Sequence, residues 1–389
     1  MNAETNAAER FSTISTIIKI TAVSILSVIS VILISSLLTV LIYGGNARHI
    51  PTSAAAKDFG IIDCFDDFTT NAISNAAEGF LEIKKVYKLN DHNQVAPEPD
   101  PDAFFTTNEP VVLEPVLECI SPRLNGEPFF FQTDTEILTG SEIAYYLDET
   151  IFTVSWKQVI NHVVYTFSEV KIEHPTQFRR FLADGQFGSE KQYLTSQMAS
   201  SVNAVVASAG DFYKYRKQGI VVYNNQTERF NQNDLDSCFI DNNGDLIFSP
   251  AHQFQTKEEL DQYVKENNIR FSLCFGPILI ENGESRVPNR YPVGEINDYF
   301  SRAAICQLGP LHYLLVTVND EGPYRNFPSL PMLTKELLSM GIQKAYTLDG
   351  GQTATIYTNN RVFNRVSYGA ERYISDIIYF ATALPGKSK

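Results

Sequence analysis

The sequence predicts an α+β domain with a mixed, largely antiparallel sheet and a few packed helices, preceded by one N-terminal transmembrane helix. Two observations predict the sheet: short runs of β-branched and aromatic residues from about Tyr145 onward, and Asn/Asp/Gly turns between them. Only two or three stretches carry helix signals, which favours α+β over a helical bundle. The third observation is an uncharged stretch near the N-terminus.

That stretch, residues 20–43, contains 24 residues without a charge. At about 1.5 Å per residue, such a helix spans a hydrocarbon core of roughly 30 Å. A cleaved signal peptide is the alternative, but its apolar region is usually about 7–15 residues long. We therefore expect a cytoplasmic tail over residues 1–13 and a transmembrane anchor over residues 14–43. Basic residues flank the anchor on both sides, so its charges give no orientation. Because nearly all of the chain follows this single span, we expect most of it to be extracellular at the cell membrane.

Residues 44–140 are predicted to form a membrane-proximal helix and an acidic, proline-rich linker. Helical periodicity extends over residues 67–90. Five prolines between residues 91 and 115 indicate a stiff, extended segment. Between positions 91 and 150 there are thirteen Asp or Glu residues and a single arginine, Arg123. This acidic composition favours a solvated spacer over a metal-binding tail.

Residues 141–389 are predicted to form the folded domain. Thr256 and Glu259 form a capping box that opens a helix ending near Asn268. A second helix over residues 330–340 ends at Gly341, which suits a left-handed closing residue. Strands are predicted at residues 150–155, 163–172, 204–207, 219–224, 271–280, 313–318 and 375–381, with hairpins over 238–248 and across Asn359-Asn360.

Charge and composition exclude several functions. The net charge of −14, with no cluster of Lys or Arg, argues against a nucleic-acid partner. The five cysteines have no CxxC spacing, so we expect no metal site and no cofactor. Cys64 and Cys119 could form a disulfide outside the cytoplasm. No P-loop, GxGxxG after a strand or HExxH is present.

The stretch at residues 345–355 (Ala-Tyr-Thr-Leu-Asp-Gly-Gly-Gln-Thr-Ala-Thr) carries the strongest functional signal. A short buried strand leads into Asp349, and Gly350 and Gly351 permit backbone angles and close approaches closed to other residues. A carboxylate in such a turn, followed by the hydroxyl of Thr353, suits a sugar or phosphate site. An isolated Asp-Gly-Gly is also typical of a plain turn between strands.

Three further pieces precede this stretch in order: residues 207–213 (Ala-Ser-Ala-Gly-Asp-Phe-Tyr), 275–279 (Phe-Gly-Pro-Ile-Leu) and 301–305 (Ser-Arg-Ala-Ala-Ile). With the closing Glu371-Arg372 and residues 375–379, they make residues 145–384 resemble the phosphodiester glycosidase family. That family includes the "uncovering enzyme" of lysosomal targeting and bacterial exopolysaccharide-associated proteins.

The resemblance implies a hydrolase that cleaves a sugar 1-phosphodiester of cell-wall or exopolysaccharide glycan. Arg302 would bind the phosphate, and Asp349 and Asp211 would supply carboxylates at the sugar. The substrate-binding residues implied are Gly210, Gly350, Gly351, Thr353, Asp320 and Arg372. Family members usually carry Asn where this chain has Ala209, and Ala offers no hydrogen bond. The alternative is therefore a non-catalytic glycan-binding or exopolysaccharide-assembly protein with a decayed site.

Overall fold

The computed structural model describes residues 88–89, 95–120, 124, 128–231, 234–292 and 295–384. These residues form four α-helices and four sheets in which every strand pair is antiparallel, which confirms the α+β class. The predicted anchor and most of the membrane-proximal helix lie outside the described residues. Within the described ranges, no helix is both long and apolar enough to cross a membrane.

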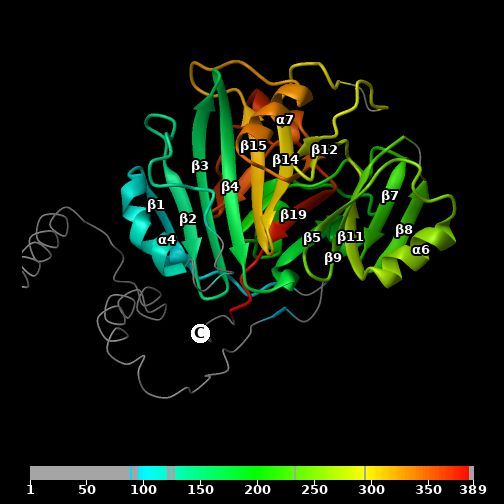
Figure 1. The fold of residues 1–389 in the computed structure, drawn as a ribbon. Helices are drawn as coiled ribbons and strands as arrows, with labels where there is room; N and C mark the ends of the chain where they lie inside the picture. The colour runs from blue at the N-terminus through cyan, green and yellow to red at the C-terminus, as the bar shows by residue number, and fades with distance from the viewer. Residues whose placement is uncertain are drawn as a thin grey trace, which may run out of the picture. The chain divides into compact units, whose positions relative to one another are not determined.

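A nine-stranded sheet forms the centre of the fold (Figure 1). The start of β14 (Arg302–Gly309) lies beside the end of β16 (Lys344–Leu348), because these two strands are antiparallel and Ala303 pairs with Leu348. In spatial order the strands are β1 (Phe104–Thr107), β2 (Ile143–Leu147), β3 (Ile151–Ile160), β4 (Val163–Ile172), β15 (His312–Asn319), β14 (Arg302–Gly309), β16 (Lys344–Leu348), β12 (Ile278–Glu281) and β13 (Glu284–Ser285).

Three smaller sheets complete the β-structure. The five-stranded sheet has the order β18 (Arg361–Val362), β17 (Ile356–Thr358), β6 (Val206–Ala209), β19 (Asp376–Phe380) and β5 (Phe178–Leu182). The other two are β10 (Leu246–Ser249), β9 (Ser237–Asp241) and β11 (Ile269–Leu273), and the hairpin of β7 (Gly219–Tyr223) and β8 (Gln226–Asn231).

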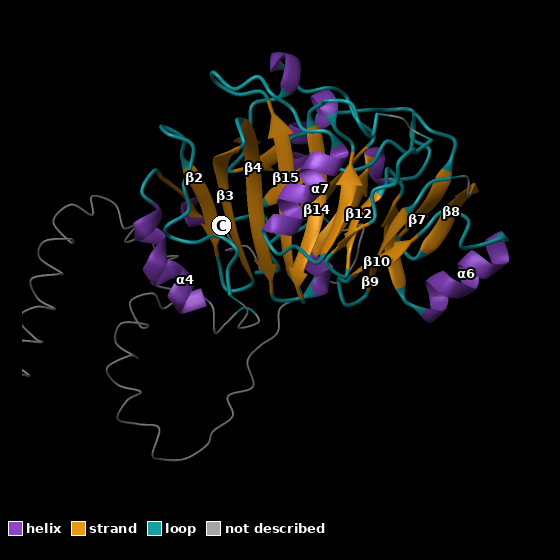
Figure 2. Cartoon of the chain, turned by 45° about the horizontal axis from the view of Figure 1, so that its top comes forward, coloured by secondary structure: helices purple, strands orange, loops and turns teal. Residues whose placement is uncertain are grey.

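The helices begin where the sequence supplies caps. α6 (Lys257–Glu266) starts with the predicted capping box of Thr256 and Glu259 and lies beside β8 (Figure 2). α7 (Leu330–Ser339) is capped by Ser329, and Gly341 follows it with φ +82°. The remaining helices are α4 (Glu114–Ile120) and α5 (Thr195–Ser201), with short 3-10 helices at η1 (Pro101–Ala103), η2 (Pro110–Leu113), η3 (Pro175–Gln177), η4 (Ala183–Gly185), η5 (Gly351–Thr353) and η6 (Ser367–Gly369).

Side chains alternate between the two faces of the nine-stranded sheet, as the pleat of a strand requires. Ala304 and Cys306 of β14 join one hydrophobic cluster with Leu333 and Leu337 of α7. Ala303 and Ile305 join another, which contains residues of the five-stranded and three-stranded sheets. The central sheet is therefore covered by α7 on one face and by other sheets on the opposite face. On its far side, the five-stranded sheet packs against α5.

Residues 101–120 differ from the predicted linker. The stretch forms η1, then β1, which pairs with β2, and then η2 and α4. Leu113 and Ile120 are fully buried in the cluster that covers the central sheet. Apolar residues at these positions bury enough surface to outweigh the prolines, which instead occupy the first turns of the short helices.

The single strand predicted at residues 271–280 is two strands in different sheets. β11 ends at Leu273 in the three-stranded sheet, and β12 starts at Ile278 in the nine-stranded sheet. Between them lie Gly276, with φ +67°, and a cis peptide bond to Pro277. A continuous apolar run hides this break, because periodicity alone does not show when a chain changes sheets.

Candidate active site

The turn after β16 contains two glycines, and each position requires glycine for a different structural reason. A Cβ on Gly350 would lie 2.6 Å from the carbonyl oxygen of Ser301, so no side chain fits there. Gly351 adopts φ +64°, with open space around its Cα, and its N–H donates to the same Ser301 carbonyl at 2.7 Å. Thr353 closes the turn with its hydroxyl, which donates to the Gly350 carbonyl at 2.6 Å. The turn is thus fixed against the start of β14.

Asp349 leads this turn and joins two sheets. Its backbone N–H donates to the carbonyl of Gly210 at 3.2 Å, at the end of β6. The residue is 8% exposed, and its carboxylate lies 3.4 Å from Nη2 of Arg372. Burial raises the pKa of Asp349 to about 6, while the charges of Arg372 and Arg216 and a hydrogen bond from Thr353 lower it and Asp211 raises it. The carboxyl group therefore titrates near neutrality, as many acid–base residues do.

Asp211 lies beside Asp349, but hydrogen bonds within the protein already hold its carboxylate. Oδ1 accepts from the N–H of Phe212 at 2.6 Å, and Oδ2 accepts from the N–H of Cys274 at 2.7 Å. Arg180 adds a charged contact to Oδ2 at 3.5 Å. Asp211 is 3% exposed, so the structure places it as a buried anchor behind the site.

A buried ion pair supports this anchor. Arg180 donates from Nε to Oδ2 of Asp376 at 2.8 Å, and its Nη2 forms an ion pair with the same oxygen at 2.8 Å. Nη1 also donates to the carbonyl of Ser272. Asp376 in turn accepts the N–H of Asp211 at 3.2 Å with both oxygens. A Cβ on Gly210 would lie 2.4 Å from Asp376 Oδ2, so glycine is required there. Burial raises the pKa of Asp376 to about 7, against the lowering effect of Arg180.

Arg302 begins β14, and its side chain holds a loop. Nη2 donates to the carbonyls of Glu295 and Asp298, both at 2.7 Å, and burial lowers the pKa of the guanidinium. The loop also meets α7, where Leu330 donates to the carbonyl of Ile296 at 3.0 Å. By strand alternation Arg302 shares the sheet face of Ala304, opposite the five-stranded sheet that carries Gly210 and Asp211.

Two other arginines flank Asp349. Arg372 pairs with Asp349 and keeps 40% of its side chain exposed. Its Cζ lies 5.4 Å from the centre of the Phe212 ring, and the Cζ of Arg216 lies 5.3 Å from the same ring. Arg216 is also fixed by a hydrogen bond to the carbonyl of Phe275 at 3.1 Å. The aromatic ring thus lies against both guanidinium groups near one carboxylate, a cation–π arrangement that orients them.

The remaining predicted residues lie outside this cluster of contacts. Asp320 pairs with Arg325 at 2.7 Å and lies 3.8 Å from Arg365. Ala209, the position where Asn was expected, is 1% exposed and packs in the hydrophobic cluster under α5, where it pairs with Ile377.

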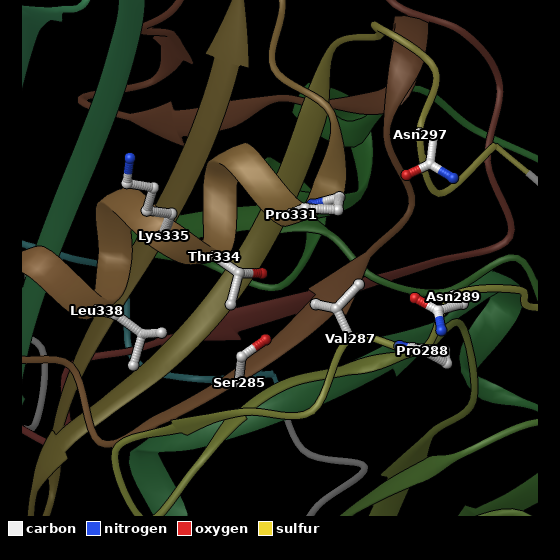
Figure 3. Close-up of a pocket in the computed structure, with 9 residues that line it drawn as sticks. All are labelled: Ser285, Val287, Pro288, Asn289, Asn297, Pro331, Thr334, Lys335 and Leu338. Carbon is white, nitrogen blue, oxygen red and sulfur yellow. The ribbon is translucent and has the colours of Figure 1, made fainter.

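A cavity of about 260 Å³ lies away from Asp349, between α7 and residues 285–289 (Figure 3). Thr334, Lys335 and Leu338 line one side of it, and neither Asp349 nor Arg372 does. Across the described residues, no group of three or more His, Cys, Asp or Glu side chains is arranged to hold a metal ion.

The residues of this site lie within one recognisable stretch. Residues 202–381 match the model of the phosphodiester glycosidase family. This domain belongs to that family. The phosphodiester glycosidase domain includes Gly210, Arg302, Asp349 and Arg372, whereas Arg180 precedes it. No curated protein matches the chain by sequence.

Solved structures show distant likenesses. The zebrafish N-acetylglucosamine-1-phosphodiester alpha-N-acetylglucosaminidase catalytic domain, auto-inhibited by its pro-peptide, is 18% identical with a TM-score of 0.48. The match covers 60% of this chain and 83% of that one. A hypothetical protein from Synechocystis is 13% identical with a TM-score of 0.43, and the match covers 64% of each chain.

Sequence reasoning assigned no role to Arg180, Arg216 or Asp376. Asp376 stands directly before the apolar run of β19, and Arg216 stands four residues after Phe212. A polar residue at the end of a strand is a usable signal for a site, but its partners come from other sheets and are not visible in one sequence.

Proposed function

We propose that this protein hydrolyses a sugar 1-phosphodiester, with Asp349 acting at the sugar. The observation that carries the proposal is the ion pair of Asp349 and Arg372, inside a phosphodiester glycosidase domain. The carboxyl is buried, titrates near pH 6 and is held in place by its own backbone. These are the properties expected of a group that handles protons in catalysis.

Asp349 acts in its ionised form. The bond between the anomeric carbon and the bridging oxygen breaks, and that oxygen leaves with the electron pair on a phosphate monoester. A phosphate monoester is already a stable anion and leaves without protonation. Water bonds to the anomeric carbon and passes a proton to Asp349, whose negative charge also stabilises the positive charge that develops on the sugar ring.

Arg372 and Arg216 hold the phosphate. A phosphodiester carries one negative charge, and guanidinium groups bind phosphate oxygens with paired hydrogen bonds. Both guanidinium groups lie against the Phe212 ring, and Arg372 contacts the Asp349 carboxylate, so a phosphate held by the two arginines would lie next to that carboxylate. The sequence assigned this task to Arg302. We give it to Arg372 and Arg216, because Nη2 of Arg302 donates to two loop carbonyls.

The test uses the full-length chain in detergent and a panel of synthetic sugar 1-phosphodiesters that starts with N-acetylglucosamine. Release of the free reducing sugar is measured for wild type, Asp349→Asn and Arg372→Met. We expect turnover with wild type and a loss of at least about a hundredfold in Asp349→Asn. Equal turnover in Asp349→Asn and wild type would rule out the assigned role.

A non-catalytic glycan-binding protein is the alternative. Ala209 motivated it, yet its side chain lies in the hydrophobic cluster under α5 and not beside the Asp349 carboxylate that the proposal uses. Saturable binding of the whole panel without turnover would favour the alternative.

We also propose that the chain is anchored in the cell membrane by residues 14–43, with the glycosidase domain outside the cell and a cell-wall or exopolysaccharide glycan as its substrate. The support is the uncharged stretch of 24 residues at positions 20–43. Protease added to intact cells should remove the domain and leave a membrane-bound fragment. Protection of the domain in intact cells would contradict this topology.

A further inference from the structure

Exposed aromatic side chains gather on segments around Asp349. In the part of the chain that the structure describes, the exposed aromatic residues are Tyr215, Tyr299, Phe300, Tyr368 and Tyr373. Aromatic side chains usually bury their rings, so an exposed ring keeps a large apolar face in water. When such rings share one region, they mark a binding surface.

Tyr215 and Tyr373 lie beside the ion pair. The hydroxyl of Tyr215 donates to the backbone carbonyl of Tyr373 at 3.3 Å, which links the two segments. Tyr373 directly follows Arg372, the partner of Asp349. The Tyr215 ring stacks on Phe212 with centres 4.5 Å apart, so it is held rigidly while 45% of the residue stays exposed.

Tyr299 and Phe300 precede the residue that anchors the catalytic turn. The carbonyl of Ser301 accepts the N–H of Gly351 at 2.7 Å. Tyr299 is 64% exposed and Phe300 is 41% exposed. Both aromatic residues thus stand directly before the segment that holds the turn, and the Phe300 ring lies against the guanidinium of Arg302, with its centre 5.6 Å from Cζ.

Tyr368 is the most unusual of the five. It is 90% exposed and has φ +65°, a left-handed conformation that a bulky side chain rarely adopts. Its short helix, η6, packs against η5 of the catalytic turn, and Gln352 donates to the carbonyl of Ala370 at 2.9 Å. A strained residue with an exposed ring beside a catalytic turn is a candidate for ligand contact.

The other exposed large hydrophobic residues of the described chain are aliphatic and lie on different segments: Val95, Val111, Val112 and Met332. The segments around Asp349 therefore expose rings and arginines without exposed aliphatic residues. Rings stack on the apolar C–H faces of sugars while neighbouring polar groups meet the hydroxyls, so this composition suits a glycan better than a protein partner.

We propose that Tyr215, Tyr299, Phe300, Tyr368 and Tyr373 form a sugar-binding surface around the scissile bond, so that the substrate is a phosphate-containing oligo- or polysaccharide. Tyr368 contacts a sugar ring next to the one that is released. The role of this surface in catalysis rests on the proposed hydrolase function, but glycan binding by the five rings can be measured without turnover.

The first experiment compares two substrates that share one scissile bond in the full-length chain. One is a monosaccharide 1-phosphate methyl ester, and the other carries a tetrasaccharide in place of the methyl group. Tyr368→Gly removes the whole side chain, ring included, and glycine adopts the left-handed backbone of this position without strain. We expect kcat/KM to fall by about tenfold or more for the long substrate and by less than about threefold for the short one.

Met332→Ala, which removes an exposed side chain on α7, serves as the control and should leave both values unchanged. Equal losses on the two substrates, or no loss on either, in Tyr368→Gly and Tyr373→Ala overturn the proposal.

The second experiment separates this proposal from the catalytic one. Neutral gluco-, manno-, galacto- and chito-tetraoses are titrated by calorimetry against the full-length chain, in a detergent without a sugar headgroup. Binding of one member that weakens in Tyr368→Gly supports the surface even when no substrate is turned over, and then only the hydrolase assignment fails. No binding of any member overturns the proposal. So does a change of oligomeric mass in the variants with unchanged glycan binding, because the rings would then join copies of the chain.

Discussion

The backbone N–H of Asp349 donates to the carbonyl of Gly210 at 3.2 Å, and this bond ties the end of β16 in the central sheet to the end of β6 in the five-stranded sheet. The two strands belong to distant parts of the sequence. The carboxylate therefore has a fixed position only when both sheets are packed on their shared core.

Asp349→Asn is expected to stabilise the protein while it removes activity. Burial raises the pKa of the folded carboxyl from 3.8 to about 6, so the folded state holds its proton more tightly than the unfolded state. Stability from this group is then present at low pH and falls as pH rises toward the folded pKa. At pH 7.5 the amide should gain roughly 1–3 kcal/mol, and at pH 4 less than about 1 kcal/mol. Urea unfolding at both pH values measures this.

Asp320→Asn is the control for that measurement, because its carboxylate is paired with Arg325 outside the buried cluster. It should show no gain at pH 7.5. A loss of stability in Asp349→Asn at pH 7.5 would mean that the contact with Arg372 outweighs the burial of the charge.

The pH dependence of kcat/KM should show a rising limb with a midpoint near 6. Asp349 is proposed to act as a carboxylate, and its folded pKa is about 6. A bound phosphodiester adds a negative charge next to it, so the midpoint for kcat should lie higher than that for kcat/KM. A falling limb near pH 6 would instead make Asp349 a proton donor.

Arg372→Met should weaken substrate binding, whereas Arg302→Met should lower the stability of the fold. Arg372 is 40% exposed and meets the carboxylate, so its loss should raise KM about tenfold or more with little change in stability. Arg302 is buried and binds the carbonyls of Glu295 and Asp298, so its loss should cost roughly 1–3 kcal/mol of stability. Thermal unfolding and steady-state kinetics on the folded fraction separate the two effects. If KM rises in Arg302→Met and not in Arg372→Met, Arg302 and not Arg372 binds the phosphate of the substrate.

Gly350→Ala and Gly351→Ala form a second matched pair. A Cβ at Gly350 meets the Ser301 carbonyl oxygen at 2.6 Å, so the turn has to move, at a cost of about 1–3 kcal/mol and most of the activity. Gly351 has open space and only its φ of +64° opposes a side chain, which costs about 1–2 kcal/mol. Gly351→Asn should recover part of that loss. If Gly350→Ala keeps full kcat, the position of the turn is not critical for catalysis.

Local patterns were enough to predict most strands, because β-branched and aromatic residues occur in short runs bounded by turn residues. β4 has the predicted bounds, and β9 and β10 form the hairpin predicted over residues 238–248. The same patterns missed β1 and joined β11 to β12, because edge pairing and a change of sheet depend on partners far away in the chain.

The sequence by itself determined the α+β class, the family motifs and the turn that carries Asp349, since these depend on neighbouring residues. Only the tertiary structure decided which arginine meets that carboxylate. Strand alternation directs Arg302 to the α7 face of the central sheet, while Arg372 reaches Asp349 from a loop before β19. Arg216, from a loop after β6, lies against the same Phe212 ring as Arg372. Long arginine side chains find their partners through packing between sheets, and no spacing within one segment encodes that choice.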